Sequence, residues 1–241
     1  MTTRILTTTL NGGDAWPGTY GEENAGPDSI VGGSGPDTVF GGGSDDVLTG
    51  ASGADQINGN AGEDAVAGGT DGDVLWGGQG NDTVRGEDDA DWVLGDKGED
   101  AVFGNGGDDF VYGGQGDDQV WGGTGADALF GGLGDDTLSG DIGADSLTGG
   151  EGEDAFVFRD SSNLDRIADF DLDEDVIIFE VGADGTINGI PIANFTELLA
   201  RLEQIGDDVF VHLCNCPVPS QGVTIVGVTI AELSANDFLF V

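Results

Sequence analysis

The chain has 241 residues, of which 47 are glycine, and its 47 acidic residues against 6 basic ones give a net charge of −41. Such a charge opposes compaction through self-repulsion, so a chain of this kind stays disordered unless cations neutralise it. The apolar content of 37% is too high for a purely disordered chain, which makes bound cations the leading explanation. The scarcity of lysine and arginine excludes nucleic acid as a partner.

The first segment, residues 1–22, is expected to form an N-terminal segment or cap. It has no apolar run of the length found in a secretory signal peptide. No stretch of the chain approaches the roughly 18 apolar residues of a transmembrane helix. We therefore expect a protein that has no N-terminal signal peptide and does not span a membrane.

Residues 23–157 are nonapeptide repeats: 14 regular copies run from Gly32 to Val157, and a degenerate copy at Glu23–Val31 precedes them. Position one is glycine in every regular copy, and position eight is apolar in all 15 copies, from Ile30 to Phe156. Position six is aspartate in all 15 copies: Asp28, Asp37, Asp46, Asp55, Asp64, Asp73, Asp82, Asp91, Asp100, Asp109, Asp118, Asp127, Asp136, Asp145 and Asp154. A fixed period of this kind indicates a solenoid.

The pattern inside each copy predicts its local structure. The first six residues are expected to form a turn that uses the access of glycine to positive φ, and the last three a short strand. Because strand side chains alternate, position eight faces one way and positions seven and nine the other. Two strands make a coil, so the repeats predict about seven coils with two parallel sheets around the position-eight side chains. The expected fold class is all-β: a right-handed parallel β-roll solenoid with a small, mostly-β C-terminal cap.

The repeat closely resembles the GGxGxDxUx consensus of the repeats-in-toxin (RTX) family, in which U is a large apolar residue and the repeats bind Ca²⁺. The resemblance covers Glu23–Val157 and implies one ion between each turn and the turn one coil later. The earlier turn would give the carbonyl oxygens of positions two and four and its aspartate. The later turn would give the carbonyl oxygens of positions one and three and its aspartate. One central site would then use Gly78, Gly80 and Asp82 with Gly95, Lys97 and Asp100.

Six oxygen ligands suit a hard cation such as Ca²⁺, and 15 turns allow up to about 13 such sites. Nine turn positions depart from glycine, and we expect weakened sites there because the carbonyl groups remain. Asparagine and aspartate tolerate the left-handed region best, so Ser44 and Ala51 are the most doubtful. The departures are Ser44, Asp71 and Asp89 at position four, and Ala51, Asn60, Glu87, Asp96, Asn105 and Asp141 at position two.

Residues 158–241 lack the repeat and are expected to form the C-terminal cap with a secretion signal. A helix is predicted at Asn194–Ile205, with Glu197 three residues after an N-cap at Asn194 and Gly206 as its stop. The predicted strands are Ala155–Phe158, which ends the roll, and Arg166–Phe170, Val176–Phe179, Val209–Leu213 and Val223–Val228.

Two short segments of the cap also resemble the RTX family. Asp165–Phe170 is similar to the D-x-I-x-D-F segment that follows the repeats. Asp237–Val241, an acidic residue before apolar ones, is similar to the uncleaved C-terminal signal that type I secretion systems read. The resemblance implies a secreted, extracellular protein. An ordinary edge strand is the alternative for Asp237–Val241.

Two other groups of potential metal ligands carry weaker signals. Asp171, Asp173 and Asp175 alternate as in an EF-hand loop, but the glycine and glutamate that complete such a loop are absent, so a solvated turn is favoured. His212, Cys214 and Cys216 alternate along one strand, which gives poor tetrahedral geometry, so ordinary strand and turn residues are favoured. His212 is the only histidine, and neither an HExxH nor a GxSxG motif occurs. The chain is not expected to be an enzyme.

Outward-facing aromatic residues gather on one of the two predicted sheets. Folding does not require aromatic side chains at outward positions, so a stripe of them usually marks an interface. Three occupants stay open: a segment of this chain, a second copy, and another protein or cell-surface partner. The main residues of this aromatic face are Trp76, Trp92, Phe110, Tyr112 and Phe130.

The function predicted from the sequence is that of a secreted bacterial calcium-binding protein that folds on multiple Ca²⁺ ions after export. Its role is expected to be structural or adhesive. The alternative is a non-catalytic accessory module of a secreted enzyme. An ice-binding roll is excluded, because positions seven and nine carry no regular ladder of threonine.

Overall fold

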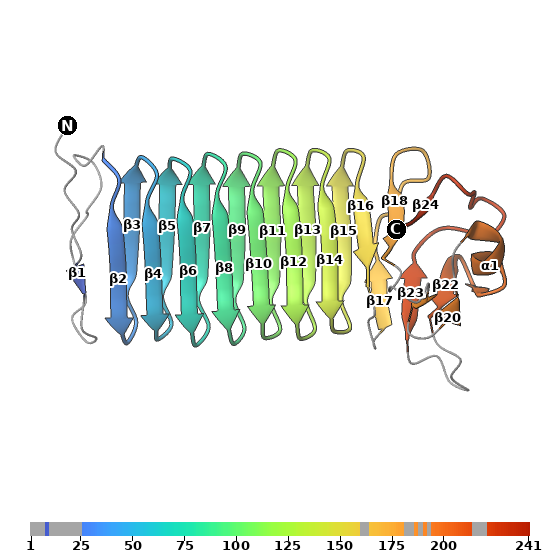
Figure 1. Cartoon of the computed structure of the whole chain (residues 1–241), viewed down its shortest axis with the longest axis horizontal. Coiled ribbons are helices and arrows are strands. Elements are labelled where there is room, and N and C mark those ends of the chain that lie inside the picture. The colour runs from blue at the N-terminus through green and yellow to red at the C-terminus, as the bar shows by residue number, and fades with distance from the viewer. Residues whose placement is uncertain are drawn as a thin grey trace.

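The computed structural model describes residues 8–9, 26–159, 164–180, 186–187, 190–191, 194–213 and 221–241. These residues form an elongated solenoid whose strands cross its long axis, with the cap at its C-terminal end (Figure 1). The predicted all-β parallel β-roll is confirmed, because alternate strands of the roll pair in parallel in two 11-stranded sheets. No helix among the described residues is long and apolar enough to cross a membrane.

The strands of the roll alternate between the two sheets along the chain. The first sheet contains, in spatial order, β1 (Thr8–Thr9), β2 (Ser29–Ser34), β4 (Val47–Ser52), β6 (Ala65–Thr70), β8 (Thr83–Asp88), β10 (Ala101–Gly106), β12 (Gln119–Thr124), β14 (Thr137–Ile142), β16 (Ala155–Phe158), β18 (Val176–Phe179) and β24 (Phe238–Phe240). The second sheet contains β3 (Thr38–Gly43), β5 (Gln56–Ala61), β7 (Val74–Gln79), β9 (Trp92–Lys97), β11 (Phe110–Gln115), β13 (Ala128–Leu133), β15 (Ser146–Glu151), β17 (Leu164–Ile167), β23 (Gly222–Ile225), β22 (Asp208–His212) and β21 (Leu202–Ile205). Outside these sheets, β19 (Thr186–Ile187) pairs with β20 (Ile190–Pro191).

The strands of the repeats are longer than the sequence predicts. Three-residue strands were expected, but each regular strand has six residues and includes positions one to three of the next copy, as β7 does. The pairing continues through this glycine-rich part, where Gly78 is in register with Asp96 and Gln79 with Lys97. Glycine is a poor strand residue, but here its backbone groups find partners in the adjacent coils, which overrides the propensity.

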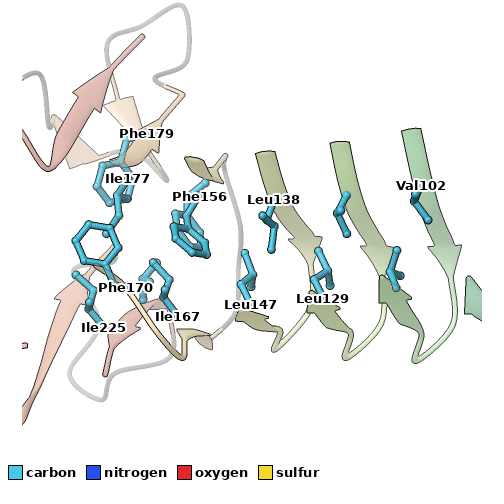
Figure 2. Close-up of a cluster of buried hydrophobic side chains, with 14 of the residues drawn as sticks. Val102, Leu129, Leu138, Leu147, Phe156, Ile167, Phe170, Ile177, Phe179 and Ile225 are labelled. Atoms are coloured by element: carbon cyan, nitrogen blue, oxygen red, sulfur yellow. The ribbon is translucent and has the colours of Figure 1, made fainter. Parts of the chain in front are cut away.

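The core is a zigzag row of position-eight side chains, which the two sheets contribute in turn. The position-eight residues from Leu48 to Phe156 are at most 1% exposed. Figure 2 shows the row passing from Val102 through Leu147 to Phe156 and on to Ile167 and Ile177. The core and both sheets therefore run into the cap without a break at Val157.

The cap confirms the predicted strands β16 and β18 and places β17, β22 and β23 within a few residues of their predicted bounds. Its attachment to the roll includes Arg159, which forms ion pairs with Asp141 at 2.9 Å and with Glu180 at 2.7 Å. These pairs link the residue that follows β16 to Asp141, near the end of β14, and to the residue that follows β18.

The predicted helix begins where expected but is shorter. Helix α1 covers Phe195–Leu199, and the Asn194 side chain caps it by accepting the backbone N–H of Glu197 at 3.1 Å. The extension to Ile205 was wrong, because Leu202–Ile205 is strand β21, paired with β22. Gly206, expected as a helix stop, has a φ of +68° and lies in the two-residue turn of this hairpin.

Candidate metal centre

The position-six aspartates form two ladders, one along each edge of the roll. In each rung a carboxylate Oδ1 accepts the backbone N–H of the aspartate one coil earlier, as Asp100 does from Asp82 at 2.7 Å. The same bond joins Asp118 to Asp100 at 2.7 Å and Asp109 to Asp91 at 2.8 Å. The 18-residue offset in each of these pairs is one coil, so the rungs repeat at the spacing of the strands.

The second oxygen of each carboxylate lies in the interior of its turn. From Asp37 to Asp154, every position-six Oδ2 is buried and accepts no hydrogen bond among the described residues. Buried carboxylates in native proteins are paired with a cation or fully hydrogen-bonded, because their desolvation is costly. A row of buried, half-satisfied carboxylates therefore fits a row of cations.

Backbone carbonyl groups converge beside these oxygens. An ideal Cβ on Gly77 would lie 2.5 Å from Asp82 Oδ2 and 2.8 Å from the carbonyl oxygen of Gly95. The space next to a position-one glycine is therefore bordered by a carboxylate and by a carbonyl from the next coil. The carbonyl of Lys97 accepts the N–H of Gly80 at 2.9 Å, which leaves it a second lone pair. Oxygen donors of this kind are those that Ca²⁺ prefers.

The structure brings together the residues of the predicted central site. Gly78 and Gly80 have φ values of +118° and +124°, and they stack against Asp96 and Gly98 of the next coil. No group of three or more His, Cys, Asp or Glu side chains suited to a metal occurs in the described part of the chain. Side chains alone therefore do not complete a site, and each would depend on turn carbonyls for its remaining ligands.

The nine predicted departures from glycine keep the turn conformation. Among the described residues, the non-glycine residues with positive φ are these nine, with values from +63° at Asp141 to +129° at Ser44. Each holds a left-handed backbone that is costly for a residue with a Cβ atom. The carbonyl groups at these positions are thus placed as in the glycine copies, at a local cost in backbone energy.

Both ladders continue one rung into the cap. Asp165 Oδ1 accepts the N–H of Asp145 at 3.2 Å, and Asp175 Oδ1 accepts that of Asp154 at 3.0 Å. Each is followed two residues later by a core isoleucine, Ile167 or Ile177, in register with position eight. Asp169 closes the last turn by accepting the N–H groups of Gly149 and Gly150 at 3.0 and 3.1 Å.

The two other groups of potential metal ligands do not form metal sites of their own among the described residues. Asp171 and Asp173 lie in an exposed or half-buried turn in which Asp171 Oδ1 accepts the Asp173 N–H at 2.9 Å. Asp175 is not a solvated turn residue: it is 8% exposed and belongs to the ladder. The predicted solvated turn is therefore wrong for Asp175, although its spacing to Ile177 copies positions six and eight. His212 Nε2 lies 2.8 Å from Glu203, and Cys214 and Cys216 lie outside the described residues.

Burial raises the pKa of the ladder carboxylates from Asp37 to Asp154 in the metal-free fold. Desolvation is the largest cause and raises the pKa of Asp82, Asp91 and Asp118 to about 7. The backbone N–H of the previous rung lowers each pKa, and neighbouring carboxylates raise it further. These groups are therefore costly to ionise in the folded chain unless a cation accompanies them.

The metal-free roll should become more stable as the pH falls. Burial raises the pKa of Asp100 to about 6 and that of Asp82 to about 7, from 3.8 in a free side chain, so folding takes up protons between those values. This stabilisation is complete below pH 4 and is lost as the pH rises through 7. In excess chelator, far-UV circular dichroism should show more β-structure at pH 4.5 than at pH 8. Equal signals at the two values would contradict the assignment of these pKa shifts.

The fold and the ladders define a class of protein, a β-roll whose turns are built to hold hard cations. The sequence matches the RTX calcium-binding nonapeptide repeat (four copies) at residues 24–57, 41–75, 58–93, 67–102, 85–120, 94–129 and 121–156. These matches cover more than half of the chain. The chain therefore belongs to the family of RTX calcium-binding repeat proteins, and calcium binding is the function that this membership supports.

The chain is similar to the extracellular lipase LipA from Serratia marcescens, with 18% identity and a TM-score of 0.34. The similarity covers 91% of this chain and 41% of the lipase chain, so the chain spans less than half the length of that lipase. The comparison with curated proteins gives no match.

Proposed function

We propose that the protein is a secreted, non-catalytic calcium-binding β-roll that folds on Ca²⁺ outside the cell and serves a structural or adhesive role. The observation that carries this proposal is the row of buried Oδ2 atoms that accept no hydrogen bond from any residue the structure describes. The ligands proposed for each ion are two ladder aspartates and the turn carbonyls between them. In the central site these are Asp82 and Asp100 with the carbonyls of Gly78, Gly80, Gly95 and Lys97.

Charge supports the same proposal. Thirteen Ca²⁺ ions would lower the net charge of the chain from −41 to −15, which removes most of the self-repulsion that opposes compaction. The proposed organisation is an N-terminal segment at 1–22, the calcium-binding roll at 23–157 and the cap at 158–241. Cytosolic Ca²⁺ is scarce, so the chain would stay unfolded and exportable inside the cell and fold outside it.

Replacing one ladder aspartate should disturb the roll locally. Asp100→Ala removes an oxygen ligand proposed to be shared by two ions and a bond to the Asp82 N–H, so the Ca²⁺ stoichiometry should fall by about two. Coils far from Gly95 should persist, because stability in a stack is a sum of neighbour terms. Calorimetric titration with Ca²⁺ measures both effects. The matched control is Glu99→Ala, which changes an exposed neighbour. Equal Ca²⁺ stoichiometry in the unchanged chain and in both variants would show that Asp100 is not a ligand.

Export is proposed to depend on the C-terminal residues. Deleting Asp237–Val241 should block secretion through a type I exporter. It also removes β24, whose Phe238 packs on Phe179 and Phe195, so the purified deletion variant should be tested for Ca²⁺-induced folding. A variant that folds with Ca²⁺ but stays in the cell supports the signal. Normal export of the shortened chain would refute it.

The outer face of the second sheet is proposed as the contact surface of the protein. Trp92 stacks on Phe110 with ring centroids 4.8 Å apart, and Phe110 packs against Phe130 at 5.1 Å. Trp92 is nevertheless 57% exposed. The described cap lies at the end of the roll and not over β7–β13 (Figure 1). An apolar stripe left open in this way favours a partner outside the described part of the chain.

A further inference from the structure

We propose that a groove beside the aromatic face binds an uncharged polysaccharide. The groove lies on the outside of the second sheet, has a volume of about 490 Å³ and crosses β5, β7, β9 and β11. The inference rests on the adhesive role proposed above and specifies the chemistry of the ligand.

The shape of the groove follows from the repeat. Its floor is the row of position-two residues Asn60, Gly78, Asp96 and Gly114, which the strand register places side by side. Gly78 and Gly114 carry no side chain, so the floor is recessed between the position-nine residues on one side and the position-three residues on the other. Four strands at about 4.8 Å spacing give the groove a length of roughly 14 Å along the axis of the roll.

One wall of the groove combines an aromatic ring with an amide. Tyr112 and Asn58 line it from position nine, and Trp76 and Leu94 stand between them in the same row. Tyrosine and tryptophan offer an apolar ring with one polar group, which suits a ligand that presents both C–H faces and hydroxyl groups. A sugar ring is a ligand of this kind.

The opposite wall supplies hydrogen-bonding side chains from position three. Gln79, Lys97 and Gln115 line it, and all three are exposed. An amide group both donates and accepts, and an ammonium group donates, so these side chains can bind hydroxyl groups in either role. The fourth position-three residue, Ala61, has no hydrogen-bonding side chain, so three successive strands, β7, β9 and β11, present such groups to an extended glycan.

The charges of the groove and of the whole chain favour an uncharged ligand. The groove contains one acidic side chain, Asp96, and one basic side chain, Lys97, and is thus formally neutral in a chain of net charge −41. An anionic polymer would be repelled by the molecule as a whole, and so would a second copy of this chain. A basic peptide would be drawn to the acidic turns instead of this groove.

Affinity electrophoresis of the Ca²⁺-loaded full chain tests the proposal. Native gels would contain hydroxyethylcellulose, galactomannan or dextran as neutral polymers, and carboxymethylcellulose as the anionic counterpart of the first. We expect at least one neutral polymer to retard the protein, and carboxymethylcellulose not to. Gln79→Ala with Gln115→Ala, and separately Tyr112→Ala, should weaken the retardation at least tenfold. The matched control is Gln119→Ala, an exposed glutamine on the opposite sheet.

Each other outcome overturns the proposal. These outcomes are no retardation by any neutral polymer, retardation by carboxymethylcellulose alone, or retardation that the groove variants leave unchanged. A dimer that the groove variants dissociate, seen by light scattering, would assign the groove to a second copy. Circular dichroism separates failure of the proposed function from failure of the glycan assignment. A chain that does not fold with Ca²⁺ overturns the proposed function. A folded chain that no neutral polymer retards overturns only the glycan assignment.

Discussion

In excess chelator at neutral pH, the chain should give the far-UV circular dichroism of an unfolded polypeptide, and millimolar Ca²⁺ should restore β-structure cooperatively. The metal-free roll would bury two rows of carboxylates whose Oδ2 atoms accept no hydrogen bond from the described part of the chain, at a net charge of −41. Against this cost, the core contributes only one buried position-eight side chain per strand. The free energy of ion binding therefore supplies the free energy that stabilises the fold.

The contrary result would be a chain equally folded with and without Ca²⁺. Mg²⁺ at the same concentration is the matched control, because it demands octahedral geometry and keeps its waters, so it should restore little structure. Monovalent salt at equal ionic strength tests the alternative that screening alone is enough.

Gly95→Ala should destabilise the Ca²⁺-loaded roll. An ideal Cβ at this position would lie 2.5 Å from both Asp100 Oδ2 and the carbonyl oxygen of Gly113, in the space proposed for the ligands. Overpacking of this kind costs about 1–3 kcal/mol before any loss of metal. For a protein of this size, each kcal/mol lowers Tm by about 2–4 °C. Thermal unfolding at fixed Ca²⁺ should therefore show a decrease of about 2–12 °C from overpacking alone, together with a higher Ca²⁺ midpoint.

Gly43→Ala is the matched control for this prediction. Gly43 occupies position three of its copy, its φ is not in the left-handed region, and nothing lies within 4 Å of its Cβ position. Its replacement should leave Tm unchanged or slightly higher, because alanine lowers the entropy of the unfolded chain. If the two variants behave alike, the loss of glycine itself, and not the crowded site, determines the effect.

The repeat was sufficient to predict the roll, because its constraints are local and recur in every copy. Position eight had to be apolar to fill the core, and Leu75 and Val102 are fully buried as expected. The turn positions were also predictable, since Asp96 and Asn105 adopt the left-handed backbone that glycine holds in other copies. The six-residue strands were not, because the pairing of Gly78 depends on the neighbouring coils and not on its own propensity.

The cap was harder to predict, because its elements depend on contacts distant in sequence. Leu198 and Leu202 suggest one helix face, yet Leu202 belongs to a strand that needs β22 as a partner. The sequence predicts a turn at Asp175, because the contact of this residue with Asp154 depends on the pairing of β18 with β16. Aligning it by the spacing from aspartate to apolar residue, without the glycines, could have found it.

Pulled from its two ends, this molecule would act as an extensible tether. Each strand lies across the long axis and bonds only to the strands one coil away, so a lengthwise force separates coils in turn. One detached coil of 18 residues releases about 60 Å of chain at roughly 3.3–3.6 Å per residue. If the ions join the coils as proposed, the calcium concentration outside the cell would set the force at which the tether lengthens.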